Sequence, residues 1–167
     1  MLIVNQQKRI INTLLMVLLI IVFGCAKMTK DDVIKKYNKV DFSVFKNKFI
    51  AIRSTNLLYT TFIINDTSPN WPYFVKYNNF TKKIIKKWSK GNSNIDFTEK
   101  QIKQMIDRLK KLKLFLIKVD KDNNVFINPY NINSPPLFLR VNKYNNIDTI
   151  KKGFIFIHYK NNWYIKM

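Results

Sequence analysis

The chain is poor in the residues that most catalytic and metal sites require. Among its 167 residues there are one cysteine, one histidine, three glycines and ten acidic residues. A zinc cluster needs several Cys or His ligands, and a phosphate-binding loop needs glycines, so the sequence excludes both kinds of site. The carboxylates are scattered and suggest no hydrolytic pair. We therefore predict that the protein is not an enzyme and uses no cofactor or metal.

Two segments resemble chemical sites but have simpler explanations. Residues 120–124 (DKDNN) begin like a calcium loop, yet Val125 stands where the sharp turn needs glycine and Asn131 where the bidentate glutamate belongs. We predict a hairpin turn there. His158 alternates with phenylalanines, which predicts a side chain on one face of a strand and not a catalytic group.

The N-terminus, by contrast, is distinctive. Lys8 and Arg9 precede an apolar run over residues 14–23, which Gly24 and Cys25 follow. A membrane-spanning helix needs roughly 20 apolar residues and a secretory signal core about 7–15, so this run is too short to span. A cationic start, an apolar core and a small residue before the cleavage point are the three parts of a secretory signal.

The sequence VFGC, residues 22–25, resembles the lipobox of bacterial lipoproteins. The resemblance implies that the Cys25 sulfur carries diacylglycerol, that cleavage occurs between Gly24 and Cys25, and that a fatty acid such as palmitate acylates the new N-terminus. Two or more acyl chains anchor a protein stably. The resemblance thus implies a lipid anchor in the bacterial cell membrane; we favour the outer membrane, on its periplasmic face or at the cell surface, over the plasma membrane. The alternative is an uncleaved anchor with an incidental cysteine.

These features divide the chain into three parts. Residues 1–24 are the predicted signal peptide, residues 25–30 a polar tether that carries lipid on Cys25, and residues 31–167 a single domain. A lone cysteine leaves no partner for a disulfide, so this domain depends on a hydrophobic core. Residues 30–32 (KDD) also resemble a tag that sends some Gram-negative lipoproteins to the cell surface, although a helix cap explains them too.

Local patterns predict the secondary structure. Thr29 and Asp32 form a capping box before a short helix that ends near residue 40. Thr98 and Gln101 form another, before a helix with one apolar face: Ile102, Met105, Ile106, Leu109 and Leu112. Strands are predicted at residues 49–55, 57–64, 114–120, 125–130 and 136–142, and in a terminal hairpin over 153–167 that turns at 160–162. We therefore predict an α+β fold, an antiparallel sheet with two or three helices packed on one face.

Residues 80–89 are predicted to form a further helix. Their apolar residues fall within an arc of about 140°: Phe80, Ile84, Ile85 and Trp88. Lysines occupy the rest of the segment and its end: Lys82, Lys83, Lys86, Lys87 and Lys90. On a helix they would form one outward patch that attracts an anionic surface, and the alternative is a solvated helix face. The preceding aromatic segment, residues 71–80, is either a recognition loop or part of the core.

A net charge of +20 indicates an anionic partner. Predicted export and the absence of zinc-finger or Arg-rich patterns argue against nucleic acid, which leaves anionic lipid, polysaccharide or an acidic protein. Part of the lysine content also fits the codon bias of an AT-rich genome. We expect a lipid-anchored envelope protein that acts as a small basic binding or structural module. The alternative is a membrane-tethered immunity or inhibitor protein against a toxin or an envelope enzyme.

Overall fold

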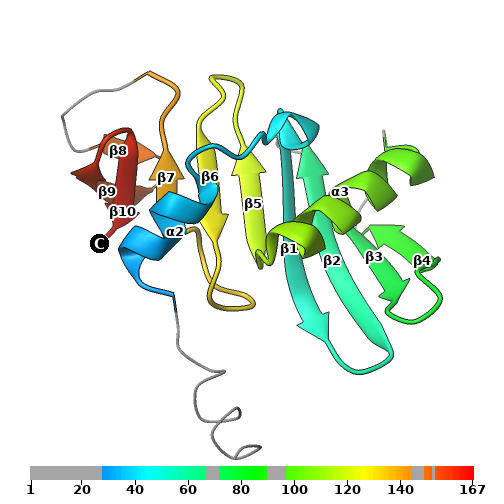
Figure 1. Ribbon diagram of the computed structural model, residues 1–167. Helices are drawn as coiled ribbons and strands as arrows, with labels where there is room; N and C mark the ends of the chain where they lie inside the picture. Colours follow the sequence, from blue (N-terminus) through cyan, green and yellow to red (C-terminus); the bar gives the residue numbers. More distant parts are fainter. Residues whose placement is uncertain (1–27, 67–71, 90–96, 144–148, 152) are drawn as a thin grey trace, which may run out of the picture. The chain divides into compact units, whose positions relative to one another are not determined.

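A computed structural model (Figure 1) describes residues 28–66, 72–89, 97–143, 149–151 and 153–167. The chain divides into two units, Met1–Lys36 and Tyr37–Met167. The described part of the first unit holds most of helix α2 (Lys30–Tyr37). Its predicted capping box is confirmed, because Asp32 N donates to Thr29 Oγ1 (3.2 Å) and Thr29 N donates to Asp32 Oδ2 (3.0 Å).

The second unit is predominantly β, so the predicted α+β class with two or three helices packed on one face is wrong. Ten strands form one antiparallel sheet in the order β4-β3-β2-β1-β5-β6-β7-β10-β9-β8. Their bounds are β1 (Lys48–Thr55), β2 (Tyr59–Asp66), β3 (Tyr73–Asn78), β4 (Ile84–Ser89), β5 (Leu116–Val119), β6 (Val125–Asn128), β7 (Phe138–Arg140), β8 (Thr149–Lys151), β9 (Phe154–Lys160) and β10 (Trp163–Lys166). A short 3-10 helix η1 (Ser43–Phe45) and helix α3 (Glu99–Leu112) complete the described elements of this unit.

The main cause of the wrong class is the segment 80–89, which forms a turn and strand β4 where a helix is predicted. A β-bulge leaves Ile85 without a partner in the β3–β4 register. Ile84 and Trp88 are four residues apart, which fits one face of a helix. The bulge instead places them on opposite faces of the strand, because Ile84 is opposite Tyr77 and Trp88 is opposite Phe74. The Ile and Trp side chains themselves favour strands.

Other predicted elements are confirmed. The strands expected at 49–55 and 57–64 pair as β1 and β2, and the hairpins expected around turns 121–124 and 160–162 are β5–β6 and β9–β10. Helix α3 begins with both hydrogen bonds of its predicted capping box, and its five predicted apolar residues are all buried.

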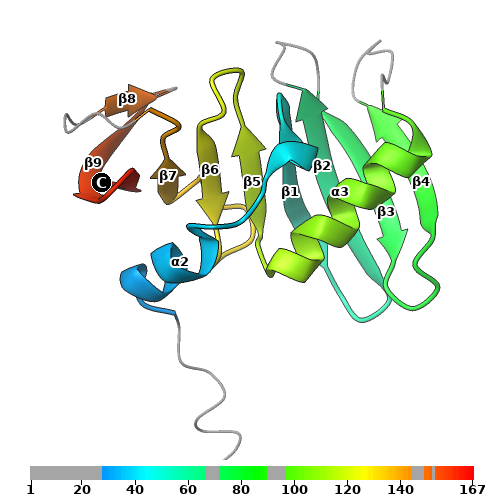
Figure 2. The same cartoon turned by 45° about the horizontal axis from the view of Figure 1, so that its top comes forward.

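Helix α3 lies across one face of the sheet at strands β1 to β3, as Figures 1 and 2 show. Lys110 of α3 holds its Nζ 4.3 Å from the ring centroid of Tyr77 and donates to Asn79 Oδ1 (3.0 Å). Burial lowers the pKa of Lys110, and the nearby charge of Lys82 lowers it further. On the sheet face that α3 covers, the Lys110 ammonium group therefore lies beside the aromatic ring of Tyr77 in a cation–π contact.

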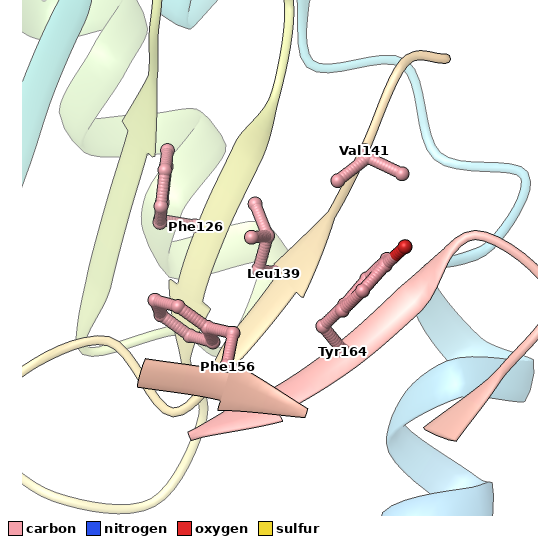
Figure 3. Close-up of a cluster of buried hydrophobic side chains, with 5 residues drawn as sticks. All are labelled: Phe126, Leu139, Val141, Phe156 and Tyr164. Atoms are coloured by element: carbon pink, nitrogen blue, oxygen red, sulfur yellow. The ribbon is translucent and has the colours of Figure 1, made fainter. Parts of the chain in front are cut away.

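The opposite end of the sheet curls upon itself. In the strand order β7 and β10 stand between β6 and β9, so a flat sheet with strands about 4.8 Å apart would separate β6 from β9 by about 14 Å. Yet the ring centroids of Phe126 on β6 and Phe156 on β9 lie 5.9 Å apart. Figure 3 shows the cluster that this curl encloses: Phe126, Leu139, Val141, Phe156 and Tyr164.

The segment that leads into the sheet is fixed by Arg140 and Trp163. The Nη1 atom of Arg140 lies 2.8–3.2 Å from the carbonyl oxygens of Tyr37, Asn38 and Val40. The Trp163 Nε1 atom donates to Asn38 Oδ1 at 3.1 Å. These bonds join residues about 100 positions apart or more, so they depend on the completed sheet.

Two buried tyrosines provide a matched test of hydrogen bonding in this fold. Tyr37 Oη donates to the Leu112 carbonyl at 2.8 Å, whereas Tyr73 Oη has no hydrogen-bond partner among the described residues. We expect Tyr37→Phe to lower the free energy of unfolding by about 1–2 kcal/mol, because it leaves a buried carbonyl unsatisfied. We expect Tyr73→Phe to leave the free energy of unfolding unchanged. A denaturant titration measures both variants. Equal losses in the two variants would contradict these bonding assignments.

Candidate functional site

The most distinctive surface of the second unit is the sheet face turned away from α3 at strands β2 to β4. On β3, Tyr73, Val75 and Tyr77 are buried, whereas Phe74 and Lys76 alternate with them and remain half-buried. Side chains on one strand alternate between faces, so these two residues lie on the side opposite α3. We call this surface the open face and define it by five residues: Tyr59, Phe74, Lys76, Lys86 and Trp88.

A stacked aromatic pair occupies the edge of the open face. Phe74 and Trp88 lie opposite each other in the register, with ring centroids 5.4 Å apart and planes inclined by 13°. Trp88 belongs to β4, and no strand of the described sheet lies beyond β4. One side of the indole therefore stacks on Phe74, and its other side faces the sheet edge. Such a ring offers a flat apolar surface to a ligand.

Two lysines lie beside this aromatic pair. Lys76 and Lys86 are direct partners across β3 and β4, on the same face as Phe74 and Trp88. The Lys76 Nζ atom lies 4.2 Å from the Tyr59 ring centroid, and Lys86 Nζ lies 5.9 Å from that of Trp88. Like charges directly opposite each other destabilise a strand pair, whereas an anion bound between them would relieve the repulsion. The open face thus combines paired cations with aromatic rings.

The lysines predicted to form one patch are separated by the strand. Lys86 lies on the open face, whereas Lys87 is opposite Val75 on the side of α3. Lys82, which has a positive φ of 56°, and Lys83 precede β4 in the β3–β4 turn. Lys90 lies outside the described residues. The single outward patch expected from a helix is therefore incorrect, because successive residues of a strand point to opposite faces.

The predicted lipidation and cleavage residues, Cys25 and Gly24, lie outside the described residues. In the part of the chain that the structure describes, no helix is long and apolar enough to span a bilayer. The lipid anchor therefore stays a prediction from the sequence.

The other segments considered for chemistry have structural roles. The predicted turn at residues 120–124 is confirmed, and Asp120 Oδ1 accepts hydrogen bonds from Asp122 N (3.0 Å) and Asn124 N (2.9 Å). His158 lies on β9, where its ring packs edge to face against that of Tyr164, with the ring centroids 5.3 Å apart. Within the described ranges, no group of three or more His, Cys, Asp or Glu residues is placed to hold a metal ion.

Sequence reasoning missed most of the open face. Residues 71–80 were expected to be either a recognition loop or core, and their described part contains a strand that contributes to both the core and the open face. The alternation in YFVKYN (residues 73–78) carries a strand signal, but aromatic residues at both kinds of position hide it. Lys86 and Trp88 were predicted to lie on a helix, Lys86 in its lysine patch and Trp88 on its apolar arc.

Comparison with known proteins adds no family for this chain. No protein-family model matches it, and neither curated proteins nor solved structures contain a match.

Proposed function

We propose that the protein is a lipid-anchored binding module of the bacterial cell envelope, and that its open face binds an acidic polysaccharide. The observation that carries the proposal is the direct opposition of Lys76 and Lys86 beside the stacked pair of Phe74 and Trp88. Lipid anchoring is supported by the lipobox-like VFGC sequence that ends at Cys25.

The chemistry of the open face suits a ligand with both sugar rings and negative charges. A carboxylate or phosphate placed between Lys76 and Lys86 would offset their mutual repulsion. The edge-facing side of Trp88 gives an apolar surface for the C–H face of a sugar ring. Tryptophan is also among the residues that contribute most to binding energy at interfaces.

The geometry favours an extended ligand. The paired residues lie on adjacent strands of a sheet, so a polymer that crosses β3 and β4 can contact cations and rings in succession. Predicted export favours an envelope polysaccharide over nucleic acid, which could use the same combination of stacking and charge.

We expect the full chain, purified in detergent, to bind alginate, which serves as a model polyuronate. We expect no binding of neutral dextran. Lys76→Gln combined with Lys86→Gln should weaken binding roughly tenfold, since each ionic contact at a protein surface contributes about 0.5–1 kcal/mol. Trp88→Ala should weaken it by a similar factor or more. Isothermal titration calorimetry at low and high salt measures both effects.

The matched control removes the same charge elsewhere. Lys87 is exposed beside Lys86 but on the opposite side of β4, and Lys103 is exposed on α3. Lys87→Gln combined with Lys103→Gln should leave alginate binding nearly unchanged. Equal losses in the two double variants would mean that net charge alone binds alginate and would refute a site on the open face. Tighter binding of single-stranded DNA than of alginate would refute the polysaccharide assignment.

A further inference from the structure

Two neighbouring turns of the second unit expose large apolar side chains. In the β1–β2 turn Leu57 is 80% exposed and Leu58 50%, and in the β3–β4 turn Phe80 is 62% exposed. Turns usually carry Gly, Pro, Asn, Asp or Ser, so three large apolar residues at turn positions need an explanation. We call the two turns, residues 56–58 and 79–83, the double-turn tip; both lie at the same end of the sheet in Figures 1 and 2.

Hydrogen bonds from Asn79 join the two turns. Its backbone N–H donates to the Leu58 carbonyl at 2.8 Å, and its side-chain Nδ2 donates to the Asn56 carbonyl at 2.9 Å. A third bond fixes the side chain from the other direction, because Thr60 Oγ1 donates to Asn79 Oδ1 at 2.9 Å. The exposed residues of both turns are therefore held together as one surface.

The polar backbone groups of the tip are largely satisfied within it. Asn56 Oδ1 accepts hydrogen bonds from the backbone N–H groups of Leu58 (3.0 Å) and Tyr59 (2.8 Å). Asn78 Oδ1 accepts in the same way from Phe80 and Thr81, both at 2.9 Å. Unpaired backbone groups cost several kcal/mol in hydrocarbon, and this internal pairing removes much of that cost. The tip can thus leave water at less expense than an ordinary turn.

Two positive charges accompany the apolar residues of the tip. Lys82 and Lys83 are exposed in the same turn as Phe80, and the Lys82 Nζ atom donates to the Asn79 carbonyl. Lysine side chains at a bilayer keep their ammonium groups among the headgroups while neighbouring apolar groups go deeper. Anionic lipids attract each such lysine.

From these contacts we infer that the double-turn tip inserts Leu57 and Phe80 into the interfacial region of an anionic bilayer. The partner is a lipid surface because Phe80 shares its turn with Lys82 and Lys83, and Asn79 joins that turn to the one that carries Leu57, so that apolar residues and cations lie together as a bilayer interface requires. This inference is separate from the proposed function, since it involves none of the residues that define the open face. A tip bound to lipid would fix how the domain is oriented on the membrane.

The test measures depth in the membrane with the full chain. In a Cys25→Ser background, Leu57→Cys gives one labelling site for the environment-sensitive dye NBD, and Met167→Cys gives a control site of matched exposure, 80% against 77%. Both proteins keep the same N-terminal segment and are reconstituted into vesicles of phosphatidylcholine with or without phosphatidylglycerol.

We expect NBD emission at position 57 to rise severalfold in anionic vesicles and to be quenched by nitroxide-labelled lipids, with little change at position 167. Phe80→Ser and Lys82→Gln with Lys83→Gln should each reduce the rise at position 57. Three results would overturn the inference: equal signals at positions 57 and 167, equal signals in neutral and anionic vesicles, or a rise that follows protein concentration and is insensitive to lipid quenchers. The last result would mean that a second copy of the chain covers the tip.

Discussion

Replacing Trp163 with alanine will lower the free energy of unfolding by about 3–5 kcal/mol, which is a large part of the 5–15 kcal/mol typical of a whole domain. Trp163 is fully buried, and its Nε1 atom donates to Asn38 Oδ1 at 3.1 Å. Truncation therefore creates a cavity and also removes the bond that holds Asn38. Equilibrium denaturation in urea, followed by circular dichroism, measures the loss.

The matched control for Trp163→Ala is Trp88→Ala. Trp88 is half-buried on the edge strand β4, so its truncation leaves less of a closed cavity, and we expect a loss of about 1–2 kcal/mol. The same measurement shows whether Trp88→Ala is folded when its alginate binding is tested. A loss for Trp163→Ala no larger than that for Trp88→Ala would contradict the place of Trp163 in the core.

Replacing Cys25 with serine will abolish incorporation of labelled fatty acid and prevent the removal of residues 1–24. The reason is chemical, because the lipobox resemblance makes the Cys25 sulfur the acceptor of diacylglycerol and serine lacks that thiol. We expect a precursor that retains residues 1–24 and carries no label, detected by gel shift and fluorography. Its control is His158→Ala, which keeps Cys25 and should be labelled like the wild type. Equal labelling of Cys25→Ser and wild type would contradict lipidation at this residue.

The sequence predicted best those elements whose signals are local. The capping box at Thr98 and the apolar stripe of α3 lie within one segment, and both are confirmed. The hairpin turns at 121–124 and 160–162 are also set by neighbouring residues. Each of these signals requires no knowledge of distant parts of the chain.

Features that depend on distant residues escaped prediction. The contact between Phe126 and Phe156 depends on the curl of the sheet, and the bonds from Arg140 to residues 37–40 join segments that only folding brings together. Strand β4 was missed for a local reason, because the bulge at Ile85 breaks the alternation that identifies a strand. The open face follows from β3 and β4, so it was missed together with them.

Strand β4 also gives the lysines of this segment a structural role. As an edge strand of the described sheet, β4 is a position at which another chain could add a strand, and exposed lysines and a bulge both discourage such pairing. Lys87 fits this role on the side of α3, where it does not contribute to the open face. One lysine-rich segment therefore supplies both edge protection and, through Lys86, the proposed binding surface.

The claim on which the proposed function depends most is that the chain is exported and anchored through Cys25. The most direct test is the intact mass of the wild-type protein extracted from membranes of the cells that express it. We predict a mature chain that begins at Cys25, lacks residues 1–24 and is heavier than its amino-acid sequence by a diacylglyceryl group and one further acyl chain. A mass that corresponds to an unmodified chain beginning at Met1 would contradict it.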